Sequence, residues 1–345
     1  MVKKLRIGIV GIGFGQHVLL PAFRSVQDIE ILTIAATSLE RAERVAKMQN
    51  IARADASWES MVNDPDLDAL VIAVPPWLQE EIIAKALLQN KHLFCEKPLG
   101  LSPERTKKFA FEAKRRNLAH MVDFEFCAIP AWLAARNFIR SGSLGILKSG
   151  ILNWQVETYA NRMKLDHWKV CSREGGGVLL QFVSHALYNL EWLCGPIAEV
   201  FVTCTPSLDA DTALHGIIKF KSNLVMSICI GSASYCGSGH CLEIYGEQGS
   251  FQLINEGSDF SGGYNFIPFE RKTKFSEEKI QPLVDFKGDS RIAAVAVLAR
   301  RFVHWIRTGD YQEPSFHQGH RVDLLIHACQ SSHQQQRWVS LTESL

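Results

Sequence analysis

The sequence has almost no net charge of either sign. Of its 345 residues, 37 are Lys or Arg and 36 are Asp or Glu, which leaves a formal net charge of +1. Proteins that bind nucleic acid or an anionic membrane surface need a cationic surplus or a cationic patch. We therefore expect neither nucleic acid nor a membrane among the partners of this chain.

Long apolar runs and paired cysteines are also missing. No stretch of about 18 apolar residues is present, so we expect no transmembrane helix. No cleavage site follows the start MVKKLRIGIVGIGFG, so we expect no signal peptide. The nine cysteines form no CxxC pair, which favours reduced thiols and a cytoplasmic location. The twelve histidines show no spacing typical of metal ligands, so we predict no metal site.

What is present is enough chain for two domains. The first third alternates short apolar runs with helical patterns, and this alternation predicts a doubly wound parallel sheet. We assign residues 1–125 to a Rossmann domain of this kind. The predicted strands cover residues 5–10, 29–36, 68–74, 91–94 and 118–124.

The pattern changes after about residue 145. Long strand-like stretches follow one another, which predicts a large, mostly antiparallel open sheet. We assign residues 126–345 to an α+β domain that binds substrate and forms oligomers. Three helices are expected, at residues 177–193, 290–308 and 319–337, and residues 256–289 are expected to be the least structured.

A glycine-rich turn joins the first predicted strand to the first helix. Gly11 and Gly13 lie where backbone N–H groups and a helix N-terminus could meet a pyrophosphate. The third glycine of the strict fingerprint would fall at Gln16, whereas Gly15 comes one residue early. The alternative is a tight turn that needs a positive φ. We favour a dinucleotide site, and we expect it to be lined by Gly11, Gly13, Phe14, Gly15, Gln16 and Pro75.

The second strand ends without the carboxylate that usually holds the ribose of NAD. Thr37 and Ser38 follow it, and Arg41 lies in the next helix. Hydroxyls and an arginine suit a 2′-phosphate, so NADP is favoured and NAD stays possible. The alternative is that Thr37 or Ser38 caps the helix and that the arginine is merely solvated.

The segment FCEKPLG places a lysine at the end of the fourth strand. Lys97 lies on the edge where doubly wound sheets bind ligands, Glu96 can orient it, and Pro98 restricts the turn. A lysine there could bind cofactor and substrate together and help to move a proton. By itself, it would more simply be a lysine that reaches solvent from the end of a strand.

These motifs resemble the glucose–fructose oxidoreductase, inositol dehydrogenase and MocA (Gfo/Idh/MocA) family over nearly the whole chain. The resemblance rests on GIVGIGFG, DALVIAVPP, FCEKPLGLS and GGGVLLQFVSHALYNLEWLCG. It implies a nicotinamide-dependent dehydrogenase in which Lys97 and His185 flank the nicotinamide and the reacting carbon. It also implies a cis peptide before Pro98 and an oligomer formed through the open sheet.

Three positions depart from the family pattern. Gln79 stands where a histidine is common, Gln181 replaces an aspartate four residues before His185, and Tyr188 replaces an acid three residues after it. A glutamine can hydrogen-bond substrate, but it cannot carry negative charge or raise the pKa of a neighbouring histidine. Without its lysine partner, His185 would be interpreted as a core histidine on an apolar helix.

The substrate is expected to contact a few acids and aromatic rings, which suit a hydroxylated ring. The candidates are Gln181, Glu125, Trp154 and Trp168, with Glu157, Tyr159, Asp166 and His167 as further possibilities. The same residues could equally belong to the core or to an interface between subunits.

The sequence thus predicts an oxidoreductase that interconverts a secondary alcohol and a ketone on a sugar or cyclic polyol. Its catalytic residues would be Lys97 and His185, and its oligomer a homodimer or homotetramer. Two alternatives stay open because of the three departures. One is a non-catalytic nicotinamide-binding sensor, and the other is a reductase of a larger conjugated molecule.

Overall fold

A computed structural model describes residues 3–165, 167–205, 210–257, 259, 263–270 and 283–341. The chain forms two units. The first comprises Met1–Glu125 and Val284–Asp323, and the second comprises Phe126–Leu283 and Leu324–Leu345. The sequence pattern predicts a single boundary after residue 125, whereas in the structure Val284–Asp323 return to the first unit.

The first unit contains a six-stranded parallel sheet in the order β3-β2-β1-β4-β5-β6. Its strands are β1 Leu5–Val10, β2 Ile29–Ala35, β3 Arg53–Asp55, β4 Ala69–Ile72, β5 His92–Cys95 and β6 His120–Val122. All four residues of β4 are buried, as expected of a strand that is covered on both faces. The predicted doubly wound sheet is confirmed. The short polar strand β3 and the helix after it were not predicted.

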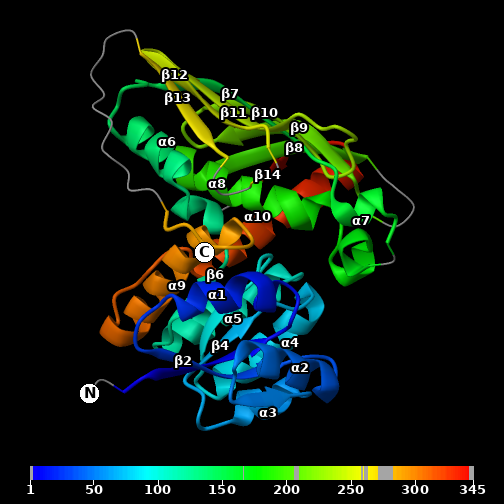
Figure 1. Ribbon diagram of the computed structural model, residues 1–345. Helices are drawn as coiled ribbons and strands as arrows, with labels where there is room; N and C mark the ends of the chain where they lie inside the picture. The colour runs from blue at the N-terminus through cyan, green and yellow to red at the C-terminus, as the bar shows by residue number, and fades with distance from the viewer. Residues whose placement is uncertain are drawn as a thin grey trace. The chain divides into compact units, whose positions relative to one another are not determined.

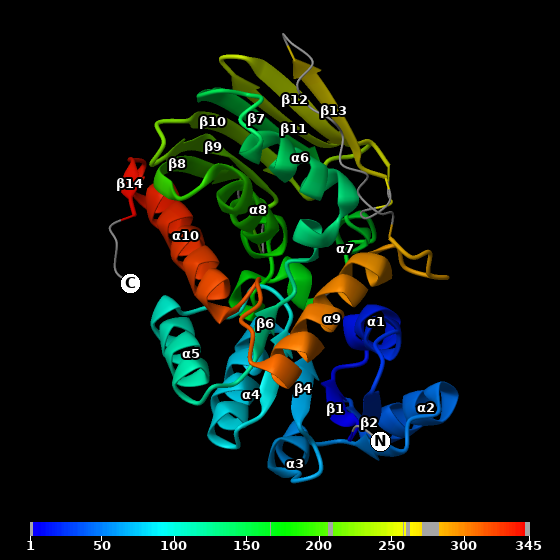
Figure 2. The same ribbon diagram turned by 90° about the vertical axis from the view of Figure 1, so that its left-hand side faces the viewer.

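Helices cover both faces of this sheet, and Figure 2 shows α1 and α9 on one side and α4 and α5 on the other. The helices of the unit are η1 Gly15–Leu19, α1 Leu20–Arg24, α2 Leu39–Gln49, α3 Trp58–Asn63, α4 Pro76–Leu88, α5 Pro103–Arg115 and α9 Arg291–Thr308. Phe302 of α9 packs edge-on against Phe23 of α1 and Phe94 of β5, with ring centroids 6.2 and 5.8 Å apart. This aromatic contact explains why a helix so late in the sequence belongs to the first unit.

The second unit contains an eight-stranded sheet in the order β13-β12-β11-β7-β10-β9-β8-β14. The strands are β7 Leu147–Gln155, β8 Ile197–Thr205, β9 Ala213–Phe220, β10 Val225–Gly231, β11 Gly239–Gly246, β12 Gly249–Asn255, β13 Asn265–Glu270 and β14 Val339–Ser340. Neighbours are antiparallel except β7 and β10, which are parallel. The predicted, mostly antiparallel sheet is confirmed. Strand β13 lies within the segment that was expected to be the least structured.

One face of this sheet is covered by helices, as Figure 1 shows for α6, α8 and α10. The helices and helical turns with residues in this unit are η2 Glu125–Ala128, α6 Pro130–Arg140, α7 Tyr159–Arg162, η3 Trp168–Val170, η4 Ser172–Glu174, η5 Leu179–Val183, α8 Ser184–Cys194 and α10 Phe316–Gln335. Along β7 buried and more exposed residues alternate, so that Leu152 and Trp154 point inward and Ile151 points outward. The helix α6 was not predicted.

Large apolar side chains also lie on the opposite face of this sheet. Ile151, Ile217, Tyr245, Ile267 and Phe269 are each between 38% and 49% exposed. Among the described residues, no helix is long and apolar enough to cross a membrane.

Candidate active site

The glycine-rich turn follows β1, and its first residue has a backbone conformation that only glycine tolerates. Gly11 has a φ of +104°, and a Cβ atom there would lie 2.1 Å from the carbonyl oxygen of Ala73. A Cβ atom on Gly13 would have no heavy atom within 4 Å, so the backbone is open to a ligand at this point. The turn therefore needs its positive φ, and it also presents open backbone at the start of a helix, which fits a pyrophosphate.

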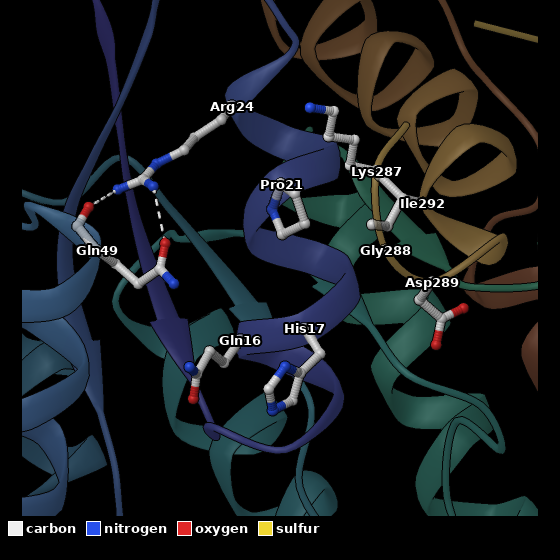
Figure 3. Close-up of a pocket in the computed structure, with 9 residues that line it drawn as sticks. All are labelled: Gln16, His17, Pro21, Arg24, Gln49, Lys287, Gly288, Asp289 and Ile292. Carbon is white, nitrogen blue, oxygen red and sulfur yellow. Dashed lines mark hydrogen bonds between the residues drawn. The ribbon is translucent and has the colours of Figure 1, made fainter. Parts of the chain in front are cut away.

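The helix after this turn begins with a π-helical segment, Gly15–Leu19. Such segments are rare and are often found at functional sites. Gln16 and His17 line a hollow of about 560 Å³, together with Lys287 and Asp289 from the segment before α9. Figure 3 shows Gln16 and His17 on successive positions at the start of this helix.

Thr37, Ser38 and Arg41 are brought together after the end of β2. Ser38 caps α2 by accepting a hydrogen bond from the main-chain N–H of Arg41 at 3.4 Å. Arg41 Nη1 donates to Thr37 Oγ1 at 2.9 Å. The capping alternative therefore applies to Ser38, whereas Thr37 and Arg41 form an exposed hydroxyl–guanidinium pair.

The EKP turn follows β5 at the carboxyl edge of the same sheet. The main-chain N–H of Glu96 donates to the carbonyl oxygen of Ile72 at 2.9 Å, so the chain stays paired with β4 up to this residue. The peptide bond between Lys97 and Pro98 is cis, as the family resemblance implied. Lys97 is partly exposed, and Pro75 immediately precedes α4.

Three carboxyl groups gather beside Lys97. Asp123 and Glu125 are 1% and 5% exposed, and the main-chain N–H of Asp123 donates to the carbonyl oxygen of Cys95 at 2.8 Å. Burial and the neighbouring Glu96 raise the pKa of Glu125 to about 7, against the opposing attraction of Arg291 and Lys97. Burial, Glu96 and Glu125 also hold the pKa of Asp123 well above its usual range. This cluster therefore retains protons near neutral pH.

Arg291 at the start of α9 connects this cluster to the glycine-rich turn. It forms a two-point ion pair with Asp289, at 2.9 and 2.6 Å, and its guanidinium lies 4.9 Å from the ring centroid of Phe14. The attraction of Asp289, Glu125 and Glu96 raises its pKa despite its burial. Sequence reasoning missed Arg291, because nothing local in the sequence connects it with the glycine-rich turn, which lies 277 residues earlier at Phe14.

In the second unit, His185 is held by aromatic packing. Its ring stacks on Phe126 with centroids 5.0 Å apart and planes 20° apart, and the residue is 7% exposed. Trp154 packs against Phe126, Phe182 and His240, with centroids 5.0 to 5.7 Å apart. Trp154 is only 2% exposed, so the structure places this expected substrate contact in the core of the unit.

The three consecutive glycines before His185 include one that leaves no room for a side chain. Gly177 has a φ of +100°, and a Cβ atom there would lie 2.3 Å from Asp211 Oδ1. Asp211 Oδ2 accepts a hydrogen bond from the main-chain N–H of Leu179 at 2.8 Å, so this carboxylate caps the start of the helix. Sequence reasoning missed Asp211, which is more than 30 residues away.

Gln181 does not simply share a helix face with His185. The segment Leu179–Val183 is π-helical, which changes the spacing on which the α-helical i, i+4 argument depends. Gln181 Nε2 donates to the carbonyl oxygen of Gly175 at 3.3 Å, and Tyr188 is 4% exposed. Gln181 therefore contacts the glycine loop of its own unit.

The remaining candidates lie in a more exposed part of the second unit. Trp168 and Glu157 are partly exposed, Tyr159 is 62% exposed, and His167 Nδ1 accepts from the main-chain N–H of Lys169 at 3.2 Å. Asp166 lies outside the described residues.

The candidates thus form one group in each unit. The first contains the glycine turn, Thr37 with Arg41, and Lys97 with its carboxyl neighbours, whereas the second contains His185 and Gln181. Among the residues that the structure describes, no group of three or more His, Cys, Asp or Glu is arranged to hold a metal ion.

Comparisons with known proteins find relatives of both the N-terminal and the C-terminal part of the chain. A family model for oxidoreductases with an NAD-binding Rossmann fold matches residues 5–124, and a GFO/IDH/MocA C-terminal domain matches residues 132–252. An uncharacterized oxidoreductase of Synechocystis sp. is 30% identical over 359 residues, which covers 98% of this chain and 96% of that protein. Levoglucosan dehydrogenase of Pseudarthrobacter phenanthrenivorans is 24% identical over 351 residues, which covers 90% of this chain and 89% of that protein.

The solved structures share the fold. A levoglucosan dehydrogenase in complex with NADH and levoglucosan has a TM-score of 0.85 at 22% sequence identity, and the match covers 99% of this chain and 100% of that one. The two family matches and the full-length relative confirm what the motifs predicted: the chain belongs to the Gfo/Idh/MocA family and is an NAD(P)-dependent oxidoreductase with an NAD-binding Rossmann domain.

Proposed function

We propose that the protein interconverts a secondary alcohol and a ketone on a sugar or cyclic polyol. The observation that carries the proposal is the position of Lys97 at the carboxyl end of β5, on the same sheet edge as the open backbone of Gly13. Ligands of doubly wound sheets bind at this edge. A levoglucosan dehydrogenase among the relatives supports a sugar-like substrate.

A nicotinamide cofactor held at the glycine-rich turn would supply the hydride chemistry, and the chain's own residues would move the proton. Lys97 donates a hydrogen bond to the reacting oxygen and stabilises the negative charge that develops there. His185 takes the proton from the hydroxyl group during oxidation and returns it during reduction. Glu125 of the neighbouring carboxyl cluster is attracted to Lys97, and this attraction opposes the rise in the pKa of Glu125.

The nucleotide that we propose is NADP(H), with NAD(H) as the alternative. No carboxylate immediately follows β2, and Thr37 and Arg41 offer a hydroxyl and a guanidinium in its place. Arginine recognises phosphate through several N–H donors at once. Gly11, Gly13, Phe14, Gly15, Gln16, Pro75 and Glu96 would complete the cofactor contacts.

Of the proposed substrate contacts, Gln181 and Trp168 are the side chains that could reach a substrate with the least movement. Both are partly exposed, whereas Glu125 and Trp154 are at least 95% buried. An amide and an indole can hydrogen-bond a hydroxyl group and stack on an apolar sugar face.

We also propose a homodimer or homotetramer that forms through the open sheet. The exposed apolar residues on its uncovered face, such as Ile217 and Phe269, favour burial against a second copy. Replacing Ile217 by Lys should convert the oligomer to a monomer in light scattering coupled to gel filtration. A protein that is monomeric before any change would contradict this interface.

The function is tested by incubating the purified protein with a panel of sugars and cyclic polyols, levoglucosan among them. NADP⁺ and NAD⁺ are supplied in parallel, and formation of reduced nicotinamide is read by its absorbance. Turnover that is faster with NADP⁺ is the expected result. Tight cofactor binding without turnover on any member of the panel would favour the sensor instead.

A further inference from the structure

One buried side chain binds three main-chain carbonyl groups of the turn that carries Lys97. Gln79 Nε2 donates to the carbonyl oxygens of Glu96 at 2.7 Å, Pro98 at 2.9 Å and Leu99 at 3.3 Å. Gln79 lies in the first turn of α4 and is 1% exposed. The turn has few donors of its own with which to satisfy these carbonyls, because proline has no N–H group.

The chemistry of this contact fixes which end of the amide faces the turn. A carbonyl oxygen can only accept a hydrogen bond, so the NH₂ group must point at the three oxygens and Oε1 must point away. Oε1 is buried and has no hydrogen-bond partner among the described residues. An unpaired buried acceptor carries a desolvation penalty, so the contact with the turn must outweigh that penalty.

The next residue on α4 holds the other end of the same loop. Glu80 Oε1 accepts from the main-chain N–H groups of Leu101 at 2.8 Å and Ser102 at 3.1 Å, and Oε2 pairs with Arg105 at 2.7 Å. A Cβ atom on Gly100 would lie 2.5 Å from Glu80 Oε1, so the loop passes close to this carboxylate. Two adjacent side chains thus bind the loop: Gln79 donates to its carbonyl groups, and Glu80 accepts from its N–H groups.

We propose that Gln79 is a positioning residue for Lys97, and that it acts with Glu80 as a clamp on the backbone of residues 96–102. Gln79 does not touch the reacting atoms, and its effect reaches them through the turn. The catalytic part of this inference rests on the proposed function of Lys97. The proposal also gives a function to the glutamine at position 79, where a histidine is common in the family.

The sharpest variant is Gln79→Glu, which keeps the size and removes the donor. An ionised carboxylate would face three carbonyl oxygens and release the turn, whereas a protonated one can still donate a single hydrogen bond. We expect kcat to fall about 100-fold at pH 8, the scale of a 1 Å misplacement. Activity relative to the unmodified protein should recover as the pH falls through the pKa of the introduced carboxyl group. Gln79→Leu should lose a similar factor at every pH.

The matched controls are two exposed residues, one on α4 and one directly after its end. Gln89→Glu makes the same chemical change at an exposed position, and Glu81→Gln is the exposed counterpart of Glu80→Gln. Both controls should keep the kcat and the pH profile of the unmodified protein. Glu80→Gln loses the ion pair with Arg105 but keeps an amide oxygen that can accept from the two N–H groups, so its effect should be smaller than that of Gln79→Glu.

A second readout does not depend on turnover. Formaldehyde with cyanoborohydride as the hydride donor methylates lysine amines, and peptide mass spectrometry follows this reaction across pH. The methylation rate of Lys97 reports the environment of its amine. We expect both Gln79 variants to change this rate, Gln79→Glu in a pH-dependent way, while the exposed Lys108 on α5 stays unchanged.

The outcomes separate the two proposals. If the unmodified protein turns over no substrate while the methylation of Lys97 responds to Gln79→Glu, the proposed function fails and the clamp stands. If turnover is present but neither kcat nor methylation differs between Gln79→Glu and Gln89→Glu, the clamp is overturned. If Gln79→Leu does not fold, the pH-dependent recovery of Gln79→Glu decides, and its absence overturns the clamp.

Discussion

The turn that carries Lys97 and the helix that carries His185 are held in place by different kinds of interaction. The main chain around Lys97 is held by hydrogen bonds that Gln79 donates to its carbonyl groups and that Glu80 accepts from its N–H groups. His185 instead packs its ring against Phe126, inside a cluster of buried aromatic side chains. One residue is thus positioned through its backbone and the other through its side chain.

The difference predicts which changes each residue tolerates. Hydrogen bonds to fixed carbonyl groups depend on the presence of a donor, so the turn should respond to small chemical changes of equal size. Ring stacking depends on shape and area, so His185 should respond to changes of volume. The following experiments test this contrast, from the largest expected effect to the smallest.

Removal of either functional group should have the largest effect. Lys97→Ala and His185→Ala should each lower kcat by at least about 100-fold, the lower scale of general acid–base catalysis. Steady-state kinetics on the best substrate of the panel measures this. The exposed residues Lys108 and His327 provide matched controls, and their replacement by Ala should leave kcat unchanged. Unchanged turnover in both site variants would remove the catalytic assignment.

The buried carboxyl cluster should make stability depend on pH. The pKa of Glu125 is raised to about 7, so the folded protein holds a proton that the unfolded chain releases near its usual pKa. The stabilisation is therefore complete below the unfolded pKa and is lost as the pH rises through about 7. Glu125→Gln removes this loss, so the variant should exceed the unmodified protein by about 3 kcal/mol in free energy of unfolding at pH 8.

Urea titrations at pH 5 and pH 8 measure this difference. Replacing the exposed Glu81 by Gln is the control, and it should change stability equally little at both values. A Glu125→Gln variant that gains no stability at pH 8 relative to pH 5 would show that Glu125 is already ionised at pH 5.

Loss of the ring under His185 should have a smaller effect. Phe126→Leu keeps an apolar side chain but removes the stacking surface, which is worth about 0.5–1.5 kcal/mol, or roughly 3- to 10-fold in kcat. Phe138→Leu makes the same change in a separate aromatic contact with Phe251 and Phe266. If the two variants lose kcat equally, stacking does not position His185.

The exposed arginine after β2 should contribute least. Arg41→Ala should weaken NADPH binding about fivefold, the scale of one exposed charge contact, and leave NADH binding unchanged. Lys47→Ala near the other end of α2 removes a cation without this contact and should change neither. Equal weakening of both nucleotides by Arg41→Ala would argue against a 2′-phosphate at this position.

The sequence predicted most of what depends on local pattern. Alternating apolar runs and helical periods predicted the parallel sheet, which is confirmed. The glycine turn was identified because its residues are contiguous.

What the sequence could not provide are contacts between distant segments. Arg291 reaches Phe14 and the carboxyl cluster through the packing of α9, and Asp211 caps a helix that begins more than 30 residues earlier. Gln79 was noticed only as a departure from the family pattern, because its three carbonyl partners become visible only once the turn is folded. Trp154 is an aromatic residue of the kind expected to contact the substrate, yet its position on the inner face of β7 buries it.

The most direct test of the central claim is a fluorescence titration of the purified protein with NADPH and NADH at one salt concentration. The account predicts that at least one nucleotide binds with a Kd well below ~1 mM, and that NADPH binds more tightly. If neither binds below that value, the turn at Gly11 and Gly13 holds no dinucleotide. The functions proposed for Lys97 and His185 would then be contradicted as well, because both require a bound nicotinamide cofactor.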